Sequence, residues 1–222
     1  SLPDELVSSP LAVSRDGNTL TWVQEDGIYQ YALETGDLKQ VPLKLPETVY
    51  FVQIRYSEDG KSLFYFGDSG QEKVTAYGVL DVETGEGTLF HAKDFDASNI
   101  TVTGGYAVVN ASVPPGASSG NGHVLFIDSI KKAGNEITLR SQDENGLATV
   151  TEDGKVLVTC SETDRKCGTL RFYDTANSEL ESEQPYSCEQ EGMSHHEAAA
   201  GHRAGDVERP QAAGAGRADS GA

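Results

Sequence analysis

The chain has 222 residues, with 35 acidic against 17 basic side chains and a formal net charge of −18. Because such an acidic surface repels phosphate backbones, we expect no nucleic-acid partner, whereas proteins and cations remain compatible with it. No run approaches the roughly 18 apolar residues that a membrane-spanning helix requires, so we also expect no membrane span.

Residues 1–10 are a lead-in segment, and a first repeated unit follows over 11–48. The pair Asp16-Gly17 predicts a tight turn between two strands, because both residue types tolerate a positive φ. An alternating apolar run follows the pair, then a second strand-like run, and the turn sequence Glu-Thr-Gly at 34–36 ends in another strand. The unit therefore reads as four strands joined by turns.

The second unit, 49–92, repeats both markers. Asp59-Gly60 follows the first Asp-Gly pair after 43 residues, and the Glu-Thr-Gly of 83–85 follows the first one after 49 residues. Two independent markers that keep the same step indicate a structural repeat of roughly 40–50 residues. Residues that recur at this step are expected to serve the scaffold rather than a specific activity.

The third and fourth units, 93–140 and 141–186, carry weaker copies. Asp153-Gly154 stands about two steps beyond the second pair, and midway between them Gly104-Gly105 takes the place of Asp-Gly. The second marker is expected at Gly134 in the third unit and at 175–178 in the fourth. A period of this length with four short strands predicts an all-β fold, a β-propeller built of four-stranded antiparallel blades.

The blade sequences carry a family resemblance. SRDGNTLTWVQEDGIYQYALETGD and SEDGKSLFYFGDSGQEKVTAYGVLDVETGE resemble TolB-type, WD-repeat-like blades, whose pattern runs Ser-Pro-Asp-Gly-Lys, strand, loop, strand, Asp-x-Glu-Thr-Gly. Similar blades form the amino-terminal propellers of prolyl-oligopeptidase-type peptidases, and EDGKVLVTCSETDRKCGTLRFYD also resembles blades of lactonase-like propellers. In place of the usual Pro, this chain has Arg15, Glu58 and Glu152, so the motifs identify the architecture better than any one family.

The pattern stops after residue 186. Residues 187–222 contain no Leu, Ile, Phe, Tyr or Trp, and we expect a disordered low-complexity tail there. Four blades followed by such a change predict an incomplete ring. An unclosed ring leaves an apolar blade face and strand edges exposed, which predicts self-association.

Cys160 and Cys167 flank a six-residue polar stretch between two strand-like runs. This spacing would place them across the base of a hairpin, where a disulfide is one interpretation and two half-buried thiols the other. A disulfide would indicate an oxidising compartment, periplasmic or extracellular.

Three motifs with a chemical meaning each lack a required part of their site. Gly-Ala-Ser-Ser-Gly at 116–120 matches the nucleophile pattern of serine hydrolases, yet no helix follows it, so we expect a loop. His195, His196 and His202 lack the spacing of a zinc helix. The run 94–99 resembles the start of a calcium loop but has Asn at the position that requires Gly, and we expect an acidic segment between blades.

The leading functional hypothesis is a non-enzymatic propeller that binds a protein partner through its loops, with 67–73 and 113–122 as the candidate contacts. No catalytic, cofactor-binding or metal-binding residue is assigned, and no cofactor is expected. One alternative is the propeller part of an oligopeptidase-type serine hydrolase whose catalytic domain is absent from this chain. A second alternative is a lactonase-like enzyme, which would require a cluster of charged residues, typically Glu, Arg and His, on the central channel. His91 and His123 are the only histidines within the repeats.

Overall fold

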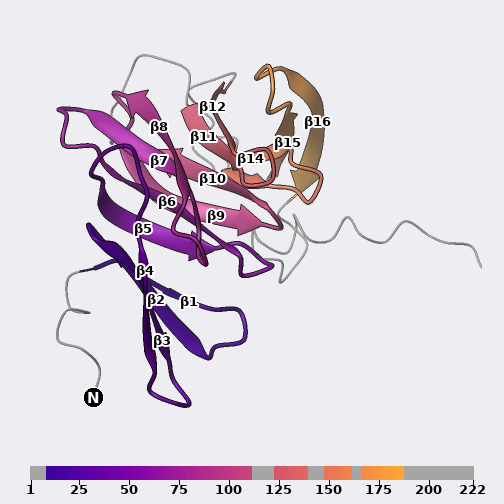
Figure 1. The fold of residues 1–222 in the computed structure, drawn as a ribbon. Coiled ribbons are helices and arrows are strands. Elements are labelled where there is room, and N and C mark those ends of the chain that lie inside the picture. Colours follow the sequence, from indigo (N-terminus) through magenta and orange to yellow (C-terminus); the bar gives the residue numbers. More distant parts are fainter. Residues whose placement is uncertain (1–8, 112–122, 140–147, 162–166, 188–222) are drawn as a thin grey trace, which may run out of the picture. The chain divides into compact units, whose positions relative to one another are not determined.

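A computed structural model describes the chain as an all-β protein (Figure 1). The described residues are 9–111, 123–139, 148–161 and 167–187. The chain divides into two compact units, 1–187 and 188–222. Of the expected tail, 187–222, only Ser187 is described, as the last residue of a strand, and the rest lies outside the described residues. Across the described segments, no helix is present that could cross a membrane.

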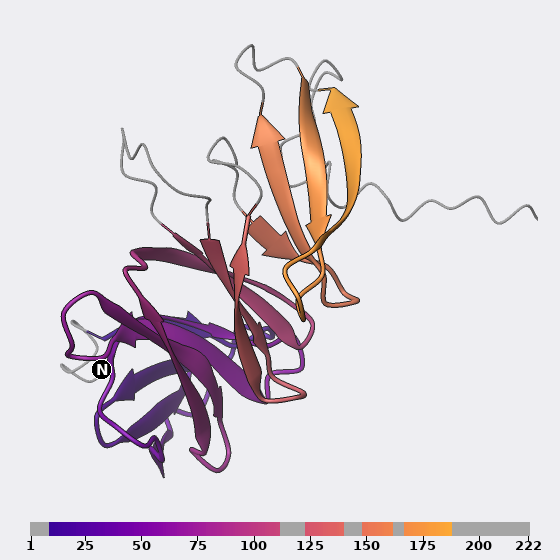
Figure 2. The same ribbon diagram turned by 90° about the horizontal axis from the view of Figure 1, so that it is seen from above.

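In the described part of the chain, sixteen strands form four sheets of four strands each, which we call blades 1 to 4 (Figures 1 and 2). Blade 1 comprises β1 (Leu11–Val13), β2 (Thr19–Gln24), β3 (Gly27–Ala32) and β4 (Leu38–Pro42). Blade 2 comprises β5 (Tyr50–Tyr56), β6 (Ser62–Asp68), β7 (Val74–Asp81) and β8 (Gly87–Lys93). Blade 3 comprises β9 (Ala97–Thr103), β10 (Tyr106–Ala111), β11 (His123–Asp128) and β12 (Ala133–Thr138). Blade 4 comprises β13 (Ala148–Val150), β14 (Val156–Ser161), β15 (Cys167–Tyr173) and β16 (Leu180–Ser187).

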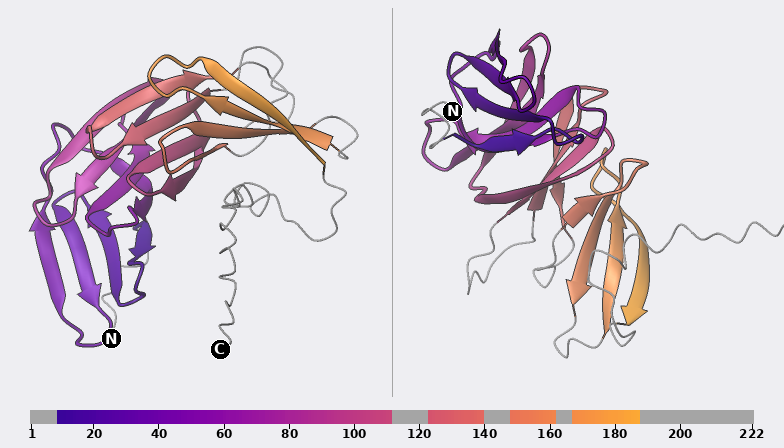
Figure 3. Two further views of the ribbon diagram at one scale, coloured as in Figure 1. Left: turned by 90° about the vertical axis from the view of Figure 1, so that its right-hand side faces the viewer. Right: turned by 90° about the horizontal axis from the view of Figure 1, so that it is seen from below.

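Within each blade the strands are antiparallel and lie in chain order, so each blade is a simple meander (Figure 3). The first strands of successive blades contact one another: β1 contacts β5, β5 contacts β9, and β9 contacts β13. Hydrogen bonds between side chains of one first strand and the backbone of the next also connect these strands. Gln53 accepts a hydrogen bond from the Ile100 N–H at 2.7 Å, and Thr101 donates one to the Ala148 carbonyl at 3.1 Å.

The core consists of three apolar clusters, each shared by two neighbouring blades. Blades 1 and 2 bury Ala12, Val23, Ile28, Val41, Ile54, Leu63, Tyr65, Ala76 and Leu80. Blades 2 and 3 bury Phe64, Phe66, Tyr77, Val79, Phe95, Ile100, Ala107, Val109, Leu125 and Ile127. Blades 3 and 4 bury Val108, Val124, Phe126, Ile137, Ala148, Val150, Val156 and Tyr173.

Blade 2 shows why the strands read as continuous apolar runs. In β6, Leu63 and Tyr65 point toward blade 1, whereas Phe64 and Phe66 point toward blade 3, and all four are at most 3% exposed. Side chains alternate between the two faces of a strand, so a central blade must be apolar on both faces. Burying each such side chain stabilises the fold by about 1.5–3 kcal/mol.

Among the described residues, no cluster joins blade 4 to blade 1, so four blades share three interfaces and the ring is not closed. The fold class expected from the sequence, four-stranded antiparallel propeller blades in an incomplete ring, is confirmed.

One face of blade 1 points away from blade 2. The strand register places Leu11 opposite Trp22 and Leu38 opposite Tyr31 on this face. Leu11 is 43% and Leu38 51% exposed there.

The Asp-Gly turns share one hydrogen-bond pattern. Ser57 Oγ donates to Asp59 Oδ1 at 2.7 Å, the Lys61 N–H donates to the same carboxylate oxygen at 3.0 Å, and Gly60 has a φ of 73°. The turn at Asp16-Gly17 repeats these bonds, and Gly17 has a φ of 76°. Each aspartate therefore stabilises the backbone of its own turn, as Asx turns do.

Blade 4 contains the third copy of this turn. Thr151 replaces Ser and donates its hydroxyl hydrogen bond to Asp153, and Gly154 has a φ of 80°. The Lys155 N–H returns a bond to Thr151 Oγ1 at 3.0 Å. The same chemistry thus recurs with a Thr in place of the Ser.

The turn of blade 3 is shorter. Thr103 pairs with Tyr106, so Gly104-Gly105 is a two-residue hairpin loop, and the positive φ, 58°, falls on Gly104 rather than on the second residue.

The second turn of blade 3 was expected at Gly134, and this position is wrong by two residues. Lys132 has the left-handed conformation, with a φ of 52°, and Gly134 lies inside β12. A ring of Phe90 packs where a Cβ at Gly134 would lie, so packing rather than turn geometry requires this glycine.

Candidate functional site

The topology gives the blades two different ends. The Asp-Gly turns and the Glu-Thr-Gly turns lie at one end, which we call the repeat-turn end. Neighbouring turns contact each other there: Arg15 Nη1 lies 4.0 Å from Glu58 Oε2, and the Glu58 N–H donates to the Gly104 carbonyl at 3.2 Å. The connections between second and third strands, and those between blades, lie at the opposite end, which we call the loop end.

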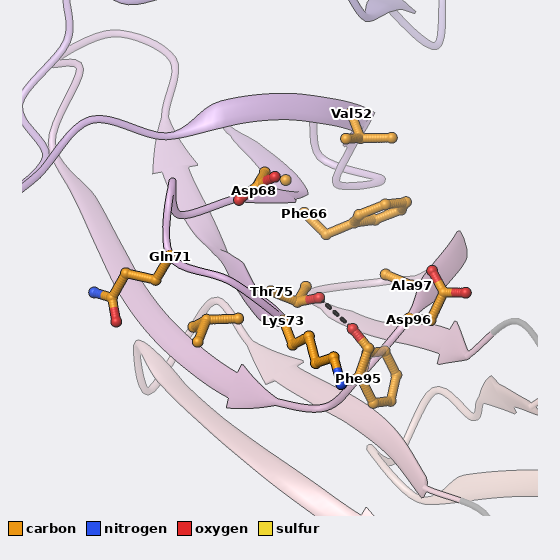
Figure 4. Close-up of a pocket in the computed structure, with 11 residues that line it drawn as sticks. Val52, Phe66, Asp68, Gln71, Lys73, Thr75, Phe95, Asp96 and Ala97 are labelled. Atoms are coloured by element: carbon orange, nitrogen blue, oxygen red, sulfur yellow. Dashed lines mark hydrogen bonds between the residues drawn. The ribbon is translucent and has the colours of Figure 1, made fainter.

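A pocket of about 320 Å³ lies at the loop end, between the β6–β7 loop (residues 69–73) and the connection from blade 2 to blade 3 (residues 94–96). The residues that line it are Val52, Phe66, Gly67, Asp68, Gln71, Lys73, Val74, Thr75, Phe95, Asp96 and Ala97. Figure 4 shows Val52 and Phe66 on one side of the pocket, with Phe95 and Asp96 on the other. An adjoining hollow of about 380 Å³ is lined by Lys73, Asp94, Phe95 and Asp96.

The floor of the pocket is apolar and fixed. Phe66 is 3% and Phe95 7% exposed, and both belong to the cluster that joins blades 2 and 3. The rim is polar: Asp68, Gln71 and Lys73 are exposed. An apolar floor with a few polar groups at its edge is typical of binding pockets in proteins.

A β-bulge at Val52 shapes the mouth of the pocket. Phe51 pairs with Gly67 and Gln53 with Phe66, so Val52 has no partner in the ladder, and its side chain is 60% exposed. A Cβ at Gly67 would lie 2.3 Å from the Tyr50 carbonyl oxygen, so the bulge requires glycine on the neighbouring strand. Bulges commonly redirect a side chain beside a functional site.

Both segments that border the pocket contain a residue in the left-handed region. Lys73 has a φ of 58° and Asp94 a φ of 52°, and the Asp94 N–H donates to the Lys73 carbonyl at 2.8 Å. Thr75 Oγ1 donates to the Phe95 carbonyl, the bond drawn in Figure 4. These bonds tie the 94–96 connection to the start of β7, and non-glycine residues with positive φ concentrate at functional sites.

Of the two loops predicted to contact a partner, the structure describes only one. Loop 67–73 borders the pocket, whereas 113–122, the Gly-Ala-Ser-Ser-Gly motif and His195, His196 and His202 lie outside the described residues. The run 94–99 is a connection between blades that continues into β9, as the interpretation as an inter-blade segment predicted. Within the described segments, no group of three or more His, Cys, Asp or Glu side chains could hold a metal ion.

The two histidines considered for a lactonase-like channel lie apart from each other. His91 is on β8, the fourth strand of blade 2, and its Nε2 lies 2.5 Å from Glu47 Oε1. His123 is on β11, the third strand of blade 3, and its Nδ1 lies 3.0 Å from Glu136 Oε1. Successive blades contact each other through their first strands, and neither histidine lies on a first strand.

The register of blade 4 places Thr169 opposite Cys160, and Cys167 pairs with Ser187 on the next strand. The two cysteines are therefore diagonal neighbours in the ladder rather than directly opposite residues. A disulfide between them stays a prediction.

Burial and hydrogen bonds shift the pKa values of three residues of the scaffold. Burial, followed by the negative charge of Glu136, raises the pKa of Tyr77 to about 12. The Lys61 N–H and the Ser57 hydroxyl lower the pKa of Asp59, and the N–H and hydroxyl of Thr84 lower that of Asp81. Both aspartates are therefore charged at neutral pH and hold their turns in that state.

Sequence reasoning missed most of the pocket. Val52, Phe66, Thr75 and Phe95 read as ordinary strand or linker residues. One local signal was available at Val52, because an extra residue interrupts the alternation of β5.

No protein-family model matches the chain, and no curated protein matches it. Among solved structures, the fold is similar to an oligogalacturonate lyase in complex with manganese, with a TM-score of 0.50 and 10% identity over 78% of this chain and 52% of the lyase chain. It is also similar to TolB from Acinetobacter baumannii, with a TM-score of 0.41 and 20% identity over 81% of this chain and 43% of TolB. A chain of the mitotic checkpoint complex gives a TM-score of 0.45 and 13% identity over 79% of this chain and 49% of the other.

At these identities the likeness concerns the fold alone. The chain spans about half the length of the structures that it resembles. The TolB-type, WD-repeat-like architecture expected from the sequence is confirmed at the level of the fold, and the four meander blades of the chain itself are the main basis for it.

Proposed function

We propose that this chain is a β-propeller scaffold that binds a protein partner at its loop end. The observation that supports this proposal is the pocket between the β6–β7 loop and the 94–96 connection. Its floor is held by packing between two blades, so its shape is preorganised, and preorganised surfaces lose less entropy on binding.

The apolar side chains around the pocket are what the loop end offers a partner. Its aspartates, like those of the repeat-turn end, accept hydrogen bonds from their own loops, as Asp68 does from the Gly70 N–H at 2.8 Å. Val52 lines the pocket and is 60% exposed, and Tyr50, 57% exposed, lies next to the β6–β7 loop that borders it. Neighbouring exposed apolar side chains with a polar surround are typical of interaction surfaces.

Site-specific photo-cross-linking tests the proposal. A photoreactive phenylalanine analogue replaces Gln71 at the pocket rim, and in a second variant it replaces Glu34 at the repeat-turn end. Both residues are exposed and lie in or next to turns. In an extract of the source cells, we expect discrete cross-linked proteins with the Gln71 variant and not with the Glu34 variant. Adducts only at Glu34, or none at either position, would contradict the proposal.

The face of blade 1 that points away from blade 2 supports a second interaction, self-association. Leu11, Val13 and Leu38 are 43%, 52% and 51% exposed on this face. The corresponding faces of blades 2, 3 and 4 are buried against the preceding blade. We expect the mass measured by light scattering to rise with concentration, and Leu38→Lys to abolish the rise. Ile130→Lys is the control, because Ile130 is 74% exposed and lies in a turn of blade 3. A constant monomer mass for the unmodified chain would contradict self-association.

The oligopeptidase alternative has no feature of its own among the described residues that favours it over a binding scaffold.

A further inference from the structure

Acidic side chains outnumber basic ones around the pocket. Asp68, Asp94 and Asp96 border the two joined hollows, and Lys73 is the single basic residue among their described lining. The chain as a whole carries a net charge of −18. An acidic rim on an acidic protein attracts basic partners and accelerates their association.

The apolar part of the pocket continues onto the open surface. Phe66 and Phe95 form the floor, Val52 projects at the mouth, and Tyr50 lies next to the β6–β7 loop, since a Cβ at Gly70 would be 3.6 Å from its ring. This surface extends along the first strand of the blade, beyond the pocket itself. Apolar anchors that fill a pocket, surrounded by polar contacts, are the pattern of protein recognition sites.

We propose that the pocket binds a single aliphatic or aromatic side chain presented by a basic segment of the partner protein. The anchor side chain enters between Val52, Phe66 and Phe95. Lys or Arg residues on either side of the anchor lie against the carboxylates of the rim. This inference rests on the proposed function, because it specifies the chemistry of the partner at the same site.

Two measurable consequences follow. Removing the anchor side chain weakens binding by about tenfold or more, because that is the effect of losing an apolar group from a pocket. Raising the salt concentration also weakens binding, because exposed charges at a rim are screened within about 10 Å at 0.1 M salt.

Three labelled peptides test the proposal by fluorescence anisotropy with the full chain. The first is acetyl-Gly-Lys-Arg-Leu-Arg-Lys-Gly, the second has Gly in place of Leu, and the third has Glu in place of every Lys and Arg. We expect saturable binding of the first, about tenfold weaker binding of the second, and no binding of the third. Absent binding of the first peptide, or equal binding of the first and third, overturns the proposal.

Variants of the chain locate the site. Val52→Lys places a positive charge at the mouth and is expected to weaken binding of the first peptide by about tenfold. Ile130→Lys is the matched control, because Ile130 is also an exposed β-branched residue, at 74% exposure, but lies in the β11–β12 turn at the repeat-turn end. If both variants bind the peptide equally well, the peptide does not use this pocket.

Two double variants, each of which removes two negative charges, test whether the carboxylates of the rim contribute to binding. Asp68→Asn with Asp94→Asn removes two charges and changes little else. The amide side chain at position 68 retains an oxygen for the Gly70 N–H, which donates to Asp68 at 2.8 Å, and asparagine tolerates the left-handed conformation at position 94. Glu34→Gln with Glu83→Gln removes the same charge from the repeat-turn end. We expect only the first pair to weaken binding and to flatten its salt dependence. Equal losses in the two pairs would show a response to net charge and overturn the role of the rim.

Different experimental results would overturn the proposed function and this inference. If photo-cross-linking at Gln71 captures a protein and the basic peptide does not bind, the loop end binds a partner of another chemistry, and only the inference is overturned. If the peptide binds and Val52→Lys weakens its binding by about tenfold, the inference holds, whatever extract is used for cross-linking.

Discussion

The two ends of the blades are built from different kinds of residues. At the repeat-turn end, the same Ser or Thr, Asp and Gly recur in three blades, and in each turn the hydroxyl donates a hydrogen bond to the aspartate. At the loop end, a bulge in the first strand occurs in blade 2 at Val52 and again in blade 3 at Ser98, but Gly67 opposite the first bulge and the acidic connection 94–96 are particular to blade 2 and its link to blade 3. The recurring turns stabilise the blades, and the residues particular to blade 2 and its link form the pocket.

This difference separates stability from recognition in space. A substitution at the repeat-turn end or in the core is expected to lower the free energy of unfolding with little effect on binding. A substitution of an exposed residue at the loop end is expected to do the reverse. The predictions below test this separation, beginning with the largest expected effect.

Tyr65→Ala is expected to cost about 3–5 kcal/mol of stability, the range of buried aromatic truncations. Tyr65 is fully buried between blades 1 and 2, contacts Phe51 edge to face, and donates a hydrogen bond to the Thr88 carbonyl at 2.8 Å. Urea denaturation followed by circular dichroism measures the loss. Tyr50→Ala is the control, because Tyr50 is a tyrosine of the same blade that is 57% exposed at the loop end. Equal losses for the two variants would refute the separation.

Gly67→Ala is expected to cost about 1–3 kcal/mol, as overpacking does in well-packed sites. The added methyl group would meet the Tyr50 carbonyl oxygen at 2.3 Å and the Phe51 Cα at 2.9 Å, so the bulge must rearrange. Because the bulge positions Val52, this variant should lose both stability and peptide binding. It is the one exception to the separation, and unchanged peptide binding would show that the bulge does not shape the pocket.

Asp59→Ala is expected to cost about 1 kcal/mol, because two hydrogen bonds to a largely exposed carboxylate are lost. The thermal unfolding midpoint measures this loss, and peptide affinity should not change. Asp59→Asn should recover part of the stability, since an amide oxygen can still accept from the Lys61 N–H. A variant with unchanged stability would show that the turn does not depend on this side chain.

The smallest effect is a dependence of stability on pH. The pKa of Asp59 and that of Asp81 lie below the ordinary value of 3.8, so the unfolded chain binds protons more readily than the folded chain. Their contribution to stability is therefore complete above the ordinary pKa and is lost as the pH falls toward the lowered one. Urea midpoints at about pH 6 and about pH 3.5 should differ more for the unmodified chain than for Asp59→Asn. An identical pH dependence would contradict the assigned role.

Local chemistry explains what could be read from the sequence. The Asp59-Gly60 turn depends on residues two or three positions apart, so its repetition at a fixed step indicates blades before any contact is known. Gly134 shows the limit of such markers. A glycine can be required by packing against Phe90 instead of by a turn, and spacing alone does not distinguish the two causes.

The pocket could be predicted only in part. The glycine and acidic residues of loop 67–73 indicate a candidate contact loop, and the aspartates of 94–96 indicate an acidic connection between blades. That the two segments border one pocket follows from the packing of blade 2 on blade 3, with Phe95 buried between them. Contacts between residues distant in sequence do not appear in a local pattern, so the floor of the site was not predicted.

Hydrogen exchange with and without the leucine-containing basic peptide tests the division between the two ends most directly. We expect slower exchange on binding in residues 67–75 and 94–97, and unchanged exchange in the Asp-Gly turn at 57–62 and the Glu-Thr-Gly turn at 83–86. Protection centred on those two turns, with none around the pocket, would contradict the assignment of binding to the loop end.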